Sequence, residues 1–141
     1  MKGKRIDHVG IVVDDLESAS GFVRDVLGFV FDRQVSIPGR LNAVFLRCGD
    51  AGVELIEVTD PTLRQERLGS AVAKLEHVAV EVDDVAAVHD ALRHSGVEMT
   101  SPTLAIAGPT RSFFTRPETT DGVMYQLFDR RVPSTAEDSP A

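Results

Sequence analysis

Cysteine and tryptophan are almost absent from this chain. Its 141 residues include one cysteine, Cys48, and no tryptophan. A single cysteine excludes an intramolecular disulfide, and a chain without disulfides suits a reducing compartment. Cys48 ends an apolar run at residues 43–48, so we expect a packed thiol rather than a nucleophile. Folding must therefore depend on an apolar core, for which 43% hydrophobic residues supply the material.

Long apolar runs and an excess of basic residues are missing as well. No run approaches the ~18 apolar residues of a membrane span, and residues 9–13 are too short for a signal peptide. The net charge of −7 and the pI of about 5.0 oppose binding to nucleic acid or to an anionic membrane. We therefore expect a soluble cytoplasmic protein whose partner is a small-molecule substrate.

What the chain does contain is an internal repeat, the signature of a duplicated structural unit. The nine residues from His8 (HVGIVVDDL) match the nine from His77 (HVAVEVDDV) at an offset of 69. Each copy continues into a helical pattern that ends at a glycine, Gly28 or Gly96. Because the two copies also share the same order of elements, chance does not explain the repeat.

The spacing of apolar residues predicts a strand, a helix and three further strands in each copy. In the first copy Asp14 is expected to cap the helix, with Glu17 completing a capping box. In the second copy Asp83 or Asp84 has this role. After the helices, strands are expected at residues 29–37, 41–48 and 51–58, and again at 97–101, 110–116 and 122–129.

These elements predict an α+β fold of two βαβββ units in tandem. The expected boundaries are residues 1–60 for the first unit and 74–131 for the second, within one domain at 5–131. Residues 61–73 are polar and are expected to form a linker with a short helix. The tail at 132–141 is rich in Pro, Ser and Asp, which predicts disorder.

Strand parity singles out four polar side chains, because alternate residues of a strand face opposite sides. In each strand concerned, the apolar residues form a core set and one polar residue faces away from it. Two imidazoles with a carboxylate and an amide oxygen suit one divalent ion (Zn, Ni, Co, Fe or Mn). A lone His or Glu is usually an ordinary polar residue, but symmetry-related pairs favour ligands. The four residues are His8, Glu54, His77 and Gln126; His89 and His94 are expected at the surface.

Five runs resemble the vicinal oxygen chelate (glyoxalase, bleomycin-resistance, dioxygenase) superfamily, across residues 5–130. The chain is most similar to methylmalonyl-CoA epimerase-like members, through HVGI at residues 8–11 and FTRP at 114–117. The resemblance implies cupped mixed sheets around a metal site, with one metal held by His8, Glu54, His77 and Gln126. It also implies isomerase or lyase chemistry through an enolate, and a homodimer. The runs are residues 7–16 (DHVGIVVDDL), 25–29 (DVLGF), 53–57 (VELIE), 76–84 (EHVAVEVDD) and 122–127 (GVMYQL).

Gln126 departs from the glutamate that the resemblance predicts at the last strand. An amide cannot carry a proton at neutral pH, which leaves Glu54 as the candidate catalytic base. Two other functions stay open at this point. One is an extradiol-type dioxygenase that holds Fe(II) with two histidines and one carboxylate. The other is a ligand-binding protein of the antibiotic-resistance type, which binds without chemistry.

Overall fold

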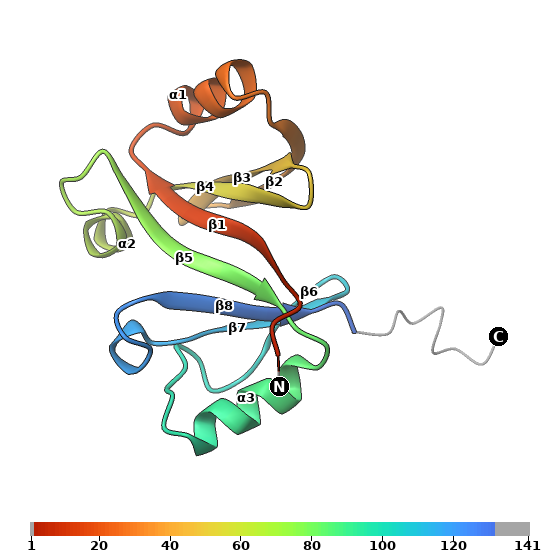
Figure 1. Cartoon of the computed structure of the whole chain (residues 1–141). Helices are drawn as coiled ribbons and strands as arrows, with labels where there is room; N and C mark the ends of the chain where they lie inside the picture. The colour runs from red at the N-terminus through yellow and green to blue at the C-terminus, as the bar shows by residue number, and fades with distance from the viewer. Residues whose placement is uncertain (1, 132–141) are drawn as a thin grey trace. The chain divides into compact units, whose positions relative to one another are not determined.

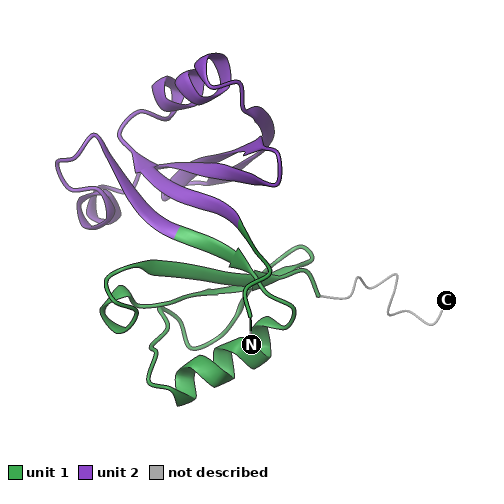
Figure 2. Ribbon diagram, viewed as in Figure 1, with its two compact units in different colours: residues 1–6, 78–141 green, residues 7–77 purple. Residues whose placement is uncertain are grey.

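The computed structural model describes residues 2–131, which form two compact units (Figures 1 and 2). Unit 2 comprises residues 7–77, and unit 1 comprises the start of the chain up to residue 6 together with the part from residue 78 onward. The tail at 132–141, for which we expected disorder, lies outside the described residues. None of the helices in residues 2–131 has the length and apolar character needed to cross a membrane.

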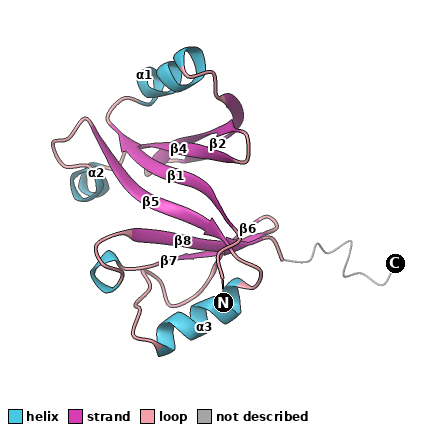
Figure 3. Ribbon diagram, in the orientation of Figure 1, coloured by secondary structure: helices cyan, strands magenta, loops and turns pink. Residues whose placement is uncertain are grey.

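Unit 2 is built on four strands in the order β2-β3-β4-β1. Figure 3 distinguishes the strands from the helices by colour. The central strands β1 and β4 are parallel, whereas β2-β3 and β3-β4 are antiparallel. Strands β1 and β5 each contribute residues to both units. The elements are β1 (Arg5–Val13), α1 (Leu16–Gly21), a π-helical turn (Phe22–Val26), β2 (Val30–Ile37), β3 (Leu41–Cys48), β4 (Ala51–Val58), α2 (Pro61–Arg67) and β5 (Ala73–Glu81).

Unit 1 continues from β5 with one helix and three more strands, in the order β8-β7-β6. Both pairs, β7-β8 and β6-β7, are antiparallel. The mixture of parallel and antiparallel strands with flanking helices confirms the α+β fold class. The elements are α3 (Val85–His94), β6 (Ala105–Ala107), β7 (Thr110–Phe114), a 3-10 turn (Pro117–Thr119) and β8 (Met124–Asp129).

The sheet of unit 2 carries apolar clusters on both faces. On one face, Val13 and Leu55 pack against residues of the helical segment that follows β1. On the other face, Val12 and Ile56 pack with Leu68, which follows α2. The apolar set that includes Val13 and Leu55 therefore faces the helix, but the opposite face is also partly buried. In unit 1 the corresponding core lies between β7 and α3 and contains Val82, Val85, Val88 and Phe113.

The first helix begins one residue later than expected. Asp15, not Asp14, is its N-cap, because the Asp15 carboxylate accepts the backbone N–H of Ser18. Asp14 still belongs to the strand connection: its N–H donates to Val72 and its carboxylate pairs with Arg64. In the second copy Asp84 caps α3 through the N–H of Ala87, so the two caps obey the sequence offset of 69.

The π-helical turn changes the face that the end of the first helix presents. In a regular α-helix the spacing of Val26 and Leu27 would place both on the apolar stripe, yet both are more than half exposed. A π-turn adds a residue to the helical repeat, so side chains beyond it rotate away from the sheet. The segment nevertheless ends at Gly28 as predicted, in the left-handed conformation (φ 76°) that a glycine adopts without strain.

Two further expectations are wrong. Residues 97–101 do not form a strand: Met99 makes one isolated bridge with Thr115, and the nearby strand is β6. Pro102 follows immediately and has no N–H with which to extend the pairing. Cys48 is exposed at the end of β3, where the chain turns toward β4, and is not a packed thiol.

Candidate metal centre

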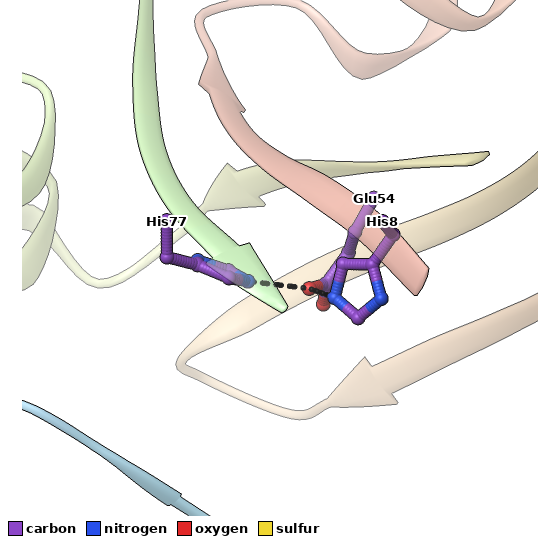
Figure 4. Close-up of side chains that lie close together, drawn as sticks. All are labelled: His8, Glu54 and His77. Carbon is purple, nitrogen blue, oxygen red and sulfur yellow. Dashed lines mark ion pairs between the residues drawn. The ribbon is translucent and has the colours of Figure 1, made fainter. Parts of the chain in front are cut away.

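Three of the four predicted ligands come together in unit 2 (Figure 4). They are His8 from β1, Glu54 from β4 and His77 from β5. Their candidate ligand atoms all lie within 4.8 Å of one another. Nε2 of His8 is 3.4 Å and Nε2 of His77 is 3.3 Å from the same carboxylate oxygen, Oε1 of Glu54. Both imidazoles are buried, with 5% and 3% of their surfaces exposed.

The parallel pairing of β1 with β4 places these residues. Gly10 lies directly opposite Glu54, and His8 lies opposite Gly52, so both ligands project from the same face of adjacent strands. Gly10 has a second role. A Cβ atom at this position would overlap the imidazole ring of His77, so only glycine leaves room for that ring. The Val-Gly-Ile sequence after His8 therefore shapes the space that His77 occupies.

Each histidine makes a hydrogen bond through Nδ1 to the acidic residue that precedes it in the sequence. Nδ1 of His8 lies 2.8 Å from the Asp7 carboxylate, and Nδ1 of His77 lies 3.1 Å from the Glu76 carboxylate. A carboxylate can only accept, so Nδ1 carries the proton and donates it in both pairs. This arrangement leaves Nε2 as the candidate ligand atom and fixes the orientation of the ring. Carboxylates that accept a hydrogen bond from a metal-ligating histidine have the same role at many metal sites.

Arginine side chains hold these two carboxylates in turn. Arg67, at the end of α2, donates two hydrogen bonds of 2.8 Å each to the carboxylate of Glu76. Arg47 on β3 lies 3.5 Å from the Asp7 carboxylate and donates to the Asp7 carbonyl at 3.1 Å. The sequence analysis missed both arginines. The acidic residues were detectable, because Asp7 and Glu76 also obey the offset of 69.

Interactions within the cluster shift the pKa values of its own side chains. Burial alone would raise the pKa of Glu54, but the adjacent imidazoles of His77 and His8 outweigh it and lower that pKa to about 2. Burial likewise opposes charge on His8, yet Asp7 and Glu54 raise its pKa above the ordinary value. The pKa of His77 is raised in the same way by Glu54 and Glu76. Glu54 is therefore a carboxylate throughout the physiological range.

The residues present fit a divalent cation. Nε2 of His8 is buried and has no hydrogen-bond partner among the described residues, although burial of an unsatisfied nitrogen costs free energy. The acceptor set of two imidazole nitrogens and one carboxylate oxygen is one that Zn²⁺, Ni²⁺, Co²⁺ and Fe²⁺ accept. A cation among these three groups would satisfy the buried nitrogen.

The remaining candidates lie in unit 1. Gln126 is half-buried in β8, opposite Phe114 of β7, and its role as a fourth ligand stays a prediction. His94 is exposed on α3, as expected. His89 is not a surface residue: its side chain is 13% exposed and its ring packs edge-on against Phe113, with 5.0 Å between centroids. It belongs to the core between α3 and β7.

Comparison with known proteins decides the family. The model of the glyoxalase/bleomycin resistance protein/dioxygenase superfamily matches residues 5–127. The chain belongs to this superfamily. Methylmalonyl-CoA epimerase of mouse mitochondria is 29% identical over 127 residues, which cover 87% of this chain and 71% of the mouse protein. The human mitochondrial methylmalonyl-CoA epimerase is 27% identical over 130 residues, covering 87% and 72%.

Solved structures of methylmalonyl-CoA epimerases have a similar fold. Methylmalonyl-CoA epimerase from Mycobacterium tuberculosis matches with a TM-score of 0.83 at 24% identity, over 95% of this chain and 92% of that one. The Streptomyces coelicolor enzyme in complex with 2-nitronate-propionyl-CoA matches with a TM-score of 0.81 at 23% identity, over 91% and 98%. At these identities the likeness establishes the fold alone.

Proposed function

We propose that this superfamily member is a metal-dependent isomerase that removes and returns the α-proton of an acyl-CoA thioester. The observation that carries the proposal is the cluster of His8, Glu54 and His77, with one buried imidazole nitrogen unsatisfied. The similarity to methylmalonyl-CoA epimerases of mouse and human supports an epimerase-type reaction. A small-molecule CoA thioester is the corresponding substrate class, and the homodimer stays a prediction.

The side chains of the cluster have distinct proposed roles. His8 and His77 bind the cation through Nε2, while Asp7 and Glu76 keep the proton on Nδ1. A divalent cation held by these residues would polarise the thioester carbonyl and make the adjacent C–H bond more acidic. Glu54 is ionised and takes the α-proton. Burial of both imidazoles limits the access of water to their ring nitrogens.

Gln126 restricts the stereochemical outcome. Epimerisation removes a proton on one face of the α-carbon and delivers one on the other, which requires a second proton carrier. If Gln126 occupies the fourth ligand position, that position cannot supply the proton. We therefore expect exchange of the α-proton with solvent to be faster than inversion of configuration.

Deuterium exchange tests the proposed reaction. The metal-loaded protein is incubated in D2O with a panel of CoA thioesters, including methylmalonyl-CoA, and α-deuterium is measured by NMR. We expect exchange with the correct thioester, loss of exchange in His77→Ala, and no change in His94→Ala, a control on the exposed face of α3. Exchange that persists in His77→Ala, or its absence with every thioester, would refute the proposal.

A second function is favoured by one specific observation. The cluster is a set of two histidines and one carboxylate, which non-haem Fe(II) oxygenases also use. Anaerobic loading with Fe(II), followed by a catechol and O2, separates the two possibilities. Oxygen uptake with ring cleavage would support the dioxygenase, whereas no uptake together with α-proton exchange would support the isomerase.

A further inference from the structure

A β-bulge in β2 determines which side chain faces the metal centre. Phe31 lies opposite Leu46 of β3, but the next residue of β3, Phe45, lies opposite Arg33. One extra residue, Asp32, is accommodated between them, which reverses the alternation of the strand. Without the bulge, Asp32 would lie opposite Phe45. The bulge therefore places a guanidinium where regular pairing would place a carboxylate.

Arg33 shares a cross-strand row with the proposed metal ligands. The register connects Arg33 to Phe45, Phe45 to Glu54, and Glu54 to Gly10, beneath the ring of His77. Directly paired residues project from the same face of a sheet. Adjacent strands are about 4.8 Å apart, so the Arg33 backbone lies roughly 10 Å from that of Glu54. Arg33 is long enough to cover much of this distance.

Phe45 contacts both the guanidinium of Arg33 and the candidate metal centre. The Cζ atom of Arg33 lies 3.9 Å from the centroid of the Phe45 ring. The same ring contacts His8 edge-on, with 5.3 Å between centroids. Phe45 is buried, so its ring is a fixed platform between the guanidinium and the imidazole. Stacking on an aromatic ring holds the guanidinium in place and leaves its N–H groups available to a ligand.

Arg33 makes no ion pair with any of the described residues. No carboxylate among residues 2–131 lies within ion-pair distance of it, and the residue is exposed. Arg47, on the same face, is by contrast engaged with Asp7 and with the carbonyl of Asp50. An oriented and uncompensated guanidinium beside a candidate metal centre is suited to binding an anionic group of a ligand.

We propose that Arg33 binds an ionised carboxylate on the acyl group of the substrate, an assignment that rests on the proposed function. The metal centre acts at the thioester carbonyl and the α-carbon, and Arg33 selects acyl groups that also carry a carboxylate. The substrate class is thus a carboxyacyl thioester rather than a neutral acyl thioester. Arg33 is a specificity-determining residue, and the bulge in β2 is what places it.

Binding to a matched pair of ligands tests this assignment. Methylmalonyl-CoA and isobutyryl-CoA differ in that a carboxylate of the first is a methyl group in the second. Each is titrated into Co²⁺-loaded protein by calorimetry, together with free CoA. We compare Arg33→Met, which keeps an unbranched stem over Phe45, Arg33→Lys, and Arg40→Met. The last is a control that removes one exposed arginine charge in the turn between β2 and β3.

We expect the wild type and Arg40→Met to prefer methylmalonyl-CoA, and Arg33→Met to lose about 10-fold of that preference. Arg33→Lys should retain part of it. An unchanged preference in Arg33→Met overturns the proposal, as does loss of the bound metal in that variant. Equal weakening of all three ligands also overturns it, because the contact would then be to the CoA phosphates. A wild type with this preference but no α-proton exchange would refute the isomerase and leave Arg33 as a carboxylate-binding residue.

Discussion

At the scale of single residues, a carboxylate at Nδ1 orients each imidazole of the cluster. Nδ1 is held by a preceding carboxylate, and Nε2 faces Glu54. Two residues outside the proposed ligand set make this possible for His77. Gly10 leaves space for its ring, and Arg67 orients the carboxylate of Glu76. Each of these residues leads to a prediction about metal affinity.

The first prediction concerns Gly10→Ala. The added methyl group must displace the ring of His77, since the two cannot occupy the same space. Metal affinity should fall by more than the roughly 10- to 100-fold that loss of a hydrogen-bonded partner costs. Competition with a chromophoric chelator measures the affinity. Gly21→Ala is the control, because a Cβ atom there meets open space. Wild-type affinity in Gly10→Ala would show that His77 is not a ligand.

The second prediction concerns Arg67→Gln. Loss of its two hydrogen bonds frees the Glu76 carboxylate and weakens its hold on Nδ1 of His77. Metal affinity should fall about 10- to 100-fold, and ¹⁵N NMR of His77 should show a mixture of tautomers. Arg64→Gln removes an arginine from the same helix that contacts Val58 and Asp14 instead. If both variants lose affinity equally, helix α2 has only a structural role.

At the scale of secondary-structure elements, the two helices that follow β1 and β5 begin alike. An aspartate caps each one by accepting a hydrogen bond from the backbone N–H three residues later. Both caps are the second residue of an Asp-Asp pair. The first member of the pair differs between the copies: Asp14 pairs with Arg64, whereas Asp83 pairs with Lys4. The duplicated sequence thus conserves the cap, while the ion pairs of the two copies differ.

The third prediction compares Asp15→Ala with Asp14→Ala. Removal of the Asp15 cap should lower the free energy of unfolding by about 1 kcal/mol, because the N–H of Ser18 loses its acceptor. Asp14→Ala removes one exposed ion pair and should cost less. Urea unfolding followed by circular dichroism measures both. A larger effect in Asp14→Ala would contradict the assignment of the cap.

Much of the fold could be predicted because it depends on local periodicity. The strands at residues 29–37, 41–48 and 51–58 correspond closely to β2, β3 and β4, and parity placed His8 and Glu54 on one face. The bulge before Arg33 and the π-turn could not be predicted. Neither has a local sequence signal, because each depends on how the chain pairs or packs with distant residues. The same holds for the contact of Arg67 with Glu76.

At the scale of the whole molecule, protons and metal compete for the same two imidazoles. In the metal-free protein the pKa of His8 and that of His77 lie above the ordinary value of about 6.5. The charged imidazoles therefore stabilise the fold fully below about pH 6.5, and this stabilisation is lost as the pH rises through the folded-state pKa values. A metal binds the neutral imidazoles, so its affinity rises over the same interval.

The fourth prediction follows from this competition. The Tm of the metal-free protein should fall as the pH is raised above about 6.5, whereas the increase in Tm on adding Zn²⁺ should become larger. Thermal unfolding with EDTA or with Zn²⁺ across this range measures both trends. His94→Ala should behave as the wild type, because His94 lies outside the cluster. A metal-induced increase in Tm that is independent of pH would exclude imidazole ligation.

The division of the chain between its two units has a consequence for synthesis on the ribosome. Unit 2 is continuous from residue 7 to residue 77, so it can fold while the second half of the chain is still being made. Unit 1 needs residues from both ends: Lys4 donates its N–H to Glu81, and Arg5 pairs with the Glu81 carboxylate. Lys4 and Arg5 are translated long before Glu81, so they must wait for this partner, and the slow step of folding should be the pairing of this segment with β5.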